Sequence, residues 1–222
     1  MKKSVSIKKI ASLGMFCALS FVMVILGKVI PNVAGFLSYD PKDSVIAISG
    51  FLFGPLYTVV VSLAVSLLEM VTISETGIIG CLMNFISTVA FAFPAALIYK
   101  KKRSYEGAVI GLFTGVVLMT ACMILWNWLI TPFYMLVERS VVEKMLLPVF
   151  LPFNGIKGGL NAALTLLLYK PLVMALRRAK LVSAPAFQSG GEKKPFRPFL
   201  LLVGLVLLLV FVALFLVFAG IL

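Results

Sequence analysis

The chain has 222 residues, of which 62% are hydrophobic and 13% are charged, and this balance excludes an ordinary soluble domain. It carries 20 Lys and Arg against 8 Asp and Glu, a net charge of +12, and it has no histidine. The lack of an imidazole excludes a His-ligated zinc site and a Ser-His-Asp triad, and with them most hydrolase functions. Cys17, Cys81 and Cys122 each lie alone in an apolar run, which is typical of packing residues. An integral membrane protein is indicated.

The first predicted transmembrane helix runs from Ile10 to Val29 and follows four lysines within the first nine residues. No small-residue cleavage site follows it, so we expect a retained helix rather than a signal peptide. The positive-inside rule places the N-terminus in the cytoplasm. The next basic cluster, residues 100–103, should lie on the same side, so an even number of crossings is expected between the two clusters.

The apolar run Ser44 to Val71 is too long for one crossing, because a single helix would extend about 42 Å against a hydrocarbon core of about 30 Å. Gly54-Pro55 lies near its middle and predicts a cytoplasmic turn between two short helices. With the following run, Ile78 to Tyr99, four crossings are predicted before the basic cluster.

After the basic cluster, Gly107 to Val137 is predicted to lead outward and a segment from about Leu146 to Ala175 to return. The sequence therefore predicts an all-α polytopic membrane protein with a six-helix bundle over residues 1–180. Residues 181–198, rich in Pro and Gly, predict a cytoplasmic linker, and the uncharged run at 199–222 predicts a seventh transmembrane helix. On this topology the positive charge collects on the cytoplasmic side, so a nucleic-acid partner is not required.

Three polar residues of the sixth predicted helix, Asn154, Lys157 and Asn161, are spaced at i, i+3 and i+7 and share one face. A lysine at the bilayer centre costs about 2.5–3.5 kcal/mol on insertion scales, so its presence requires a reason. We interpret this face as part of a ligand site. The alternative is that Lys157 extends to the outer surface while Asn154 caps the helix.

Further polar residues fall in the outer half of the predicted bundle or in its outer loops. Each asparagine alone is equally compatible with a hydrogen bond between helices, but together they predict an extracellular pocket. Asp43 or Ser44 is also expected to cap the second helix, and Trp126 and Trp128 to stack on a flat ligand together with Tyr39. The predicted binding residues are Tyr39, Asp43, Ser44, Glu69, Asn84, Asn127, Asn154 and Lys157.

A stripe of small residues, Ala11, Gly14 and Ala18, lies near the cytoplasmic end of the first helix. Such a stripe permits close approach of another helix, from this chain or from a partner. The sequence contains no GxxxxGK[ST] phosphate loop and no HExxH motif. We therefore expect no catalytic site, metal or cofactor, and any transport must draw its energy from another protein.

Several segments carry a resemblance: Tyr39-Asp-Pro-Lys-Asp43, Gly50-Phe-Leu-Phe-Gly-Pro55, Thr76 to Phe85, Ala95 to Lys100, Met123 to Asn127 and Phe153 to Lys157. In this combination, from about residue 8 to 178, the chain resembles the riboflavin-binding S component of energy-coupling factor (ECF) vitamin transporters. The resemblance implies a subunit of the bacterial cell membrane that captures riboflavin, or FMN, outside the cell. It also implies association with a membrane coupling protein and two cytoplasmic ATPases.

In that family small residues of the first helix, typically AxxxA, meet the coupling protein, so Ala11, Gly14 and Ala18 are the predicted partner-binding residues. The family usually ends after six helices, and the tail from about Ser183 departs from it. Residue chemistry alone leaves two alternatives open. One is an S component for another vitamin, such as a pterin or a thiamine-like ligand, and the other is a membrane enzyme or scaffold without a transported ligand.

Overall fold

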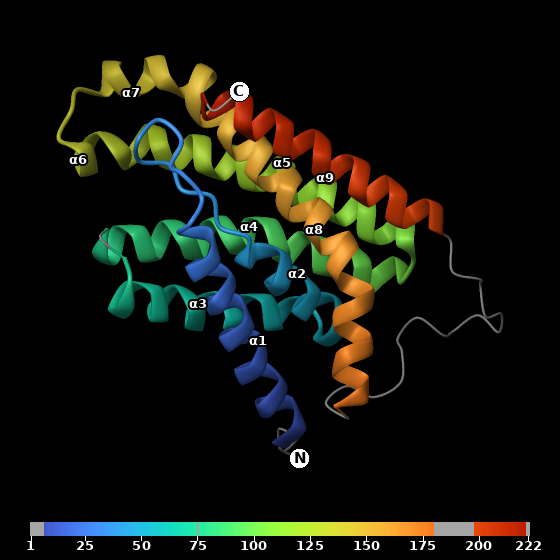
Figure 1. The fold of residues 1–222 in the computed structure, drawn as a ribbon. Coiled ribbons are helices and arrows are strands. Elements are labelled where there is room, and N and C mark those ends of the chain that lie inside the picture. The colour runs from blue at the N-terminus through green and yellow to red at the C-terminus, as the bar shows by residue number, and fades with distance from the viewer. Residues whose placement is uncertain (1–6, 75, 180–197, 221–222) are drawn as a thin grey trace.

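The computed structural model describes residues 7–74, 76–179 and 198–220, and its helical architecture confirms the predicted all-α class (Figure 1). The main helices are α1 (Ile7–Gly27), α2 (Lys42–Phe53), α3 (Pro55–Thr72), α4 (Gly77–Lys102), α5 (Tyr105–Leu129), α8 (Leu151–Arg178) and α9 (Pro198–Phe218). Between α5 and α8 the chain forms two short helices and a π-helical turn, namely α6 (Thr131–Met135), α7 (Arg139–Met145) and η1 (Leu146–Phe150).

Five helical segments of the described chain are long and apolar enough to cross a membrane, and the protein is a multi-pass membrane protein. They comprise α1, α3, α4, α5 and the continuous stretch from α7 through α8. Helix α2 has only 12 residues but lies in the middle of the bundle, where residues 42–51 are all buried. It packs against α1, α3, α4 and α8. Because these helices rather than lipid surround it, α2 does not need the length of a full membrane crossing.

The predicted break between α2 and α3 is confirmed. Gly54 adopts a φ of 104°, which favours glycine, and Pro55 occupies the first turn of α3, where its missing N–H costs nothing. The prediction of one helix from Gly107 to Val137 is wrong beyond Leu129. Because Pro132 has no N–H to donate to the carbonyl four residues earlier, α5 ends at Leu129 and the short helix α6 begins at Thr131.

Helix α9 packs along α8, as Figure 1 shows for the two C-terminal helices. The absence of a side chain at Gly159 lets the ring of Phe211 approach closely, and Phe215 lies 5.9 Å from Tyr39, centroid to centroid. The predicted linker at 181–198 falls almost entirely on residues 180–197, outside the described chain. That α9 is a seventh crossing stays a prediction.

The predicted orientation places the end of α4 in the cytoplasm and α7 outside. Single cysteines replacing the exposed residues Lys101 and Ser140 test it, in a background that lacks the three native cysteines. On intact cells an impermeant maleimide should label Ser140→Cys and spare Lys101→Cys, while permeabilised cells should show both labelled. The reverse pattern on intact cells would invert the topology.

Candidate functional site

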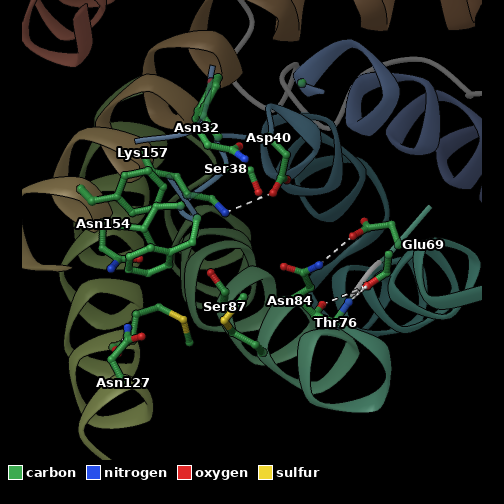
Figure 2. A pocket seen from close by; sticks show the side chains of 18 of the residues that line it. Asn32, Ser38, Asp40, Glu69, Thr76, Asn84, Ser87, Asn127, Asn154 and Lys157 are labelled. Carbon is green, nitrogen blue, oxygen red and sulfur yellow. Dashed lines mark hydrogen bonds and ion pairs between the residues drawn. The ribbon is translucent and has the colours of Figure 1, made fainter. Parts of the chain in front are cut away.

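A cavity of about 350 Å³ opens at one end of the bundle. It lies between the loop that joins α1 to α2, the turn between α3 and α4, the end of α5 and the first turns of α8. Its volume is within the range of small-molecule sites, roughly 300–1,000 Å³. Figure 2 shows polar side chains from all four segments pointing toward one another inside it.

Six of the eight predicted binding residues line this cavity, namely Tyr39, Glu69, Asn84, Asn127, Asn154 and Lys157. Ligand binding by these residues stays a prediction. Asp43 and Ser44 do not line it, because both are buried in the first turn of α2. Asp43 accepts a hydrogen bond of 2.6 Å from Thr88, and Ser44 donates one of 2.7 Å to the carbonyl of Pro41. The expectation that Asp43 or Ser44 caps α2 is wrong, because the helix starts earlier, after Pro41.

Lys157 points into the cavity and does not extend to the outer surface. The residue is 7% exposed, and its ammonium nitrogen lies 3.2 Å from Oδ2 of Asp40 (Figure 2). Burial by itself raises the pKa of the Asp40 carboxyl, but the positive charges of Lys157 and Lys42 outweigh burial and hold that pKa below its ordinary value. Asp40 is therefore ionised, and it fixes the loop before α2 to the beginning of α8.

A second buried ion pair lies beside the first. The ammonium of Lys42 is 3.6 Å from Asp40 and 2.5 Å from Oε1 of Glu69, and both Lys42 and Glu69 are almost fully buried. Oε2 of Glu69 in turn accepts a hydrogen bond of 2.7 Å from the amide nitrogen of Asn84. A continuous chain of polar contacts thus connects Lys157 on one wall of the cavity with Asn84 on the opposite wall.

Two further asparagines of the cavity, Asn127 and Asn154, are also held by the protein. The amide nitrogen of Asn127 donates to the carbonyl of Met123 at 2.7 Å, and that of Asn154 donates to the carbonyl of Phe150 at 2.8 Å. Both acceptors lie one helical turn earlier. The asparagines are consequently set in fixed orientations before any ligand arrives.

The expected stacking role of Trp126 and Trp128 is wrong, because neither residue lines the cavity. Trp128 points to the surface, where its indole N–H donates to Glu143 at 3.0 Å and Arg139 lies over its ring. Trp126 packs against the hydrophobic core. The aromatic walls of the cavity are instead formed by Phe36, Tyr39, Tyr134 and Phe153.

Sequence reasoning missed Asp40 and Lys42. Neither is among the predicted binding residues, although a buried Lys157 requires a nearby carboxylate, and Asp40 belongs to a short charged segment that enters a buried helix. That requirement was the available signal.

The small-residue stripe of α1 lies apart from the cavity. Ala11, Gly14 and Ala18 are all exposed, and a Cβ built at Gly14 would have no heavy atom within 4 Å. Within the described chain, α1 packs against α2 and α3, and this stripe is left uncovered. Its role in binding a partner stays a prediction.

Comparisons with known proteins all indicate the same family for this chain. Residues 8–169 match the family described as ECF transporter, substrate-specific component. The riboflavin transporter RibU of Staphylococcus aureus (strain TCH60) is 28% identical over 77% of this chain and 93% of its own length. The riboflavin transporter FmnP of Bacillus subtilis (strain 168) is 29% identical over 68% of this chain and 85% of its own.

A solved structure, described as the S component of a bacterial ECF transporter, is 30% identical to this chain. It superposes with a TM-score of 0.64 over 77% of this chain and 98% of the solved one. The family match covers α1 to most of α8, including every segment that forms the cavity, and leaves α9 outside. The chain belongs to the substrate-specific components of ECF transporters.

Proposed function

We propose that this chain captures riboflavin, with FMN as a second ligand, at the outer face of a bacterial cell membrane. Uptake is then driven by a membrane coupling protein and two ATPase subunits that bind from the cytoplasmic side. The similarity to two riboflavin transporters supports this ligand. In this proposal the chain is a binding subunit and not an enzyme.

The observation that carries the proposal is the composition of the cavity. Phe36, Tyr39, Tyr134 and Phe153 offer aromatic surface to a flat apolar ring system. Lys157 and the asparagines offer one strong donor and several amide groups. A flavin requires this combination, because its tricyclic ring is flat and its ribityl chain and ring edge carry hydrogen-bonding groups.

The same proposal gives a role to the small-residue stripe of α1 and to helix α9. The uncovered stripe of Ala11, Gly14 and Ala18 is the contact for the coupling protein, since close helix packing requires small residues. Helix α9 is an additional crossing, because its 21 residues would extend about 32 Å, close to the thickness of the hydrocarbon core. Because α9 packs on α8, it leaves the stripe on α1 accessible.

Titration of the purified full-length protein in detergent tests the ligand. Riboflavin fluorescence should be quenched on binding with a stoichiometry of one, because the ring becomes enclosed by aromatic side chains. FMN should compete, and thiamine and a pterin should not. Calorimetric binding of thiamine or the pterin, with no response to riboflavin, would assign the cavity to another vitamin.

A further inference from the structure

Three of the four asparagines that line the cavity have their amide orientation set by the protein. Asn84, Asn127 and Asn154 each donate an amide hydrogen to a protein acceptor. The carbonyl oxygen of Asn127 is also engaged, because it accepts a hydrogen bond of 2.8 Å from Thr131. For Asn84 the carbonyl oxygen has no protein donor among the described residues, and Figure 2 shows it on the side turned away from Glu69, toward the cavity.

Glu69 is the reason for the orientation of Asn84. Both oxygens of its carboxylate are used, Oε1 by the ammonium of Lys42 and Oε2 by the amide nitrogen of Asn84. An ionised carboxylate can only accept hydrogen bonds, so an amide beside it must present its NH₂ group. Because Glu69 is 4% exposed and Lys42 is 1% exposed, little bulk water is available to replace either partner.

We propose that Glu69 acts as a positioning residue that makes the Asn84 wall of the cavity a hydrogen-bond acceptor. It holds the NH₂ group of Asn84 and turns the carbonyl oxygen toward the ligand, so this wall selects a ligand N–H or O–H group. Glu69 itself does not touch the ligand. The inference rests on the proposed function for the identity of that ligand, in which the imide N–H of the flavin ring and the ribityl hydroxyls are the available donors.

The variant Glu69→Gln should reverse the polarity of this wall. The introduced glutamine side chain has a single acceptor, its carbonyl oxygen, which must face the ammonium of Lys42. Its NH₂ group therefore faces Asn84. The amide of Asn84 then turns over and presents its own NH₂ group to the cavity, where a ligand donor cannot bind it. The Kd of riboflavin, measured by fluorescence quenching, should rise about tenfold, as expected when one hydrogen bond in a dry pocket is lost.

The exchanged variant Glu69→Gln/Asn84→Asp is the matched control. It keeps the net charge of the pair, and the new carboxylate accepts a hydrogen bond from the glutamine while its second oxygen faces the cavity. Riboflavin affinity should return to within about threefold of the wild-type value. If the exchanged variant is folded, by its thermal unfolding midpoint without ligand, but binds no better than Glu69→Gln, then Glu69 contacts the ligand directly and the proposal is wrong.

Two analogues identify the donor. One analogue, 3-methylriboflavin, lacks the imide N–H, and the other, lumiflavin, lacks the ribityl hydroxyls. For the analogue that lacks the donor bound by Asn84, the Kd of Glu69→Gln should equal that of the wild type. If Glu69→Gln weakens the binding of both analogues by the same factor, the wall does not recognise a donor.

If Glu69→Gln does not fold, the exchanged variant and Asn84→Leu decide the question. Near wild-type riboflavin binding is expected for the exchanged variant and about a tenfold loss of affinity for Asn84→Leu. Failure of the wild-type protein to bind riboflavin would instead contradict the proposed function.

Discussion

Replacing Lys157 with methionine should raise the Kd of riboflavin roughly tenfold or more. The ammonium of Lys157 is almost fully buried in the cavity, and among the described residues it makes one hydrogen bond, to Asp40, so two of its three donors are available to a ligand. Removing a partner from a desolvated hydrogen bond costs about 1–3 kcal/mol, and each 1.4 kcal/mol is a tenfold change. Titration by flavin fluorescence measures the effect.

The protein itself should survive this change, because Asp40 keeps Lys42 at 3.6 Å as a second partner. Lys144→Met is the matched control, since Lys144 is exposed on α7 and does not line the cavity. Its riboflavin affinity should equal that of the wild type. Unchanged affinity in Lys157→Met, at an unchanged unfolding midpoint, would remove Lys157 from the binding site.

The helices were predictable where the signal is local. Gly54-Pro55 divides a run that is too long for one crossing, and both residues act through their own backbone geometry. The same physics explains the error at Pro132, where a proline inside an apolar run ended α5 although hydropathy continued beyond it. Hydropathy reports which residues suit lipid, and the backbone decides where a helix ends.

The site was predictable from the cost of burying polar groups, which singled out Lys157 and the asparagines. The ion pair between Asp40 and Lys157 was not predictable, because these residues are separated by 117 positions in the chain and meet only after the bundle has assembled. Trp126 and Trp128 illustrate the same limit. They flank Asn127 in the sequence, but on a helix neighbouring residues point in different directions, so only the asparagine faces the cavity.

The tail illustrates a further difference between family and chain. The family match ends at residue 169, yet Phe215 of α9 contacts Tyr39, which lines the cavity. Family resemblance therefore gave no information on this contact, and hydropathy predicted only the helix. The close approach of α9 depends on Gly159, where any side chain would meet the ring of Phe211.

The double variant Gly14→Trp/Ala18→Trp should abolish uptake while leaving riboflavin binding unchanged. Both positions are exposed on α1 and face away from the cavity, so two indole rings there do not disturb the pocket. They would hold the coupling protein away from the helix, and dispersion contacts weaken steeply when packed surfaces are separated. Because the sequence contains no phosphate loop, the chain depends on its partner subunits for the use of ATP.

The measurements are riboflavin uptake by cells that express the variant with its partner subunits, co-purification with the coupling protein, and the Kd of the isolated variant. Val60→Trp/Leu67→Trp is the control, because these residues lie on one exposed face of α3, at 54% and 43% exposure. The control places two indole rings on another exposed helical face and should leave both uptake and co-purification intact. Normal uptake by the α1 variant would mean that the coupling protein binds elsewhere, because bulk on this stripe then has no effect on assembly.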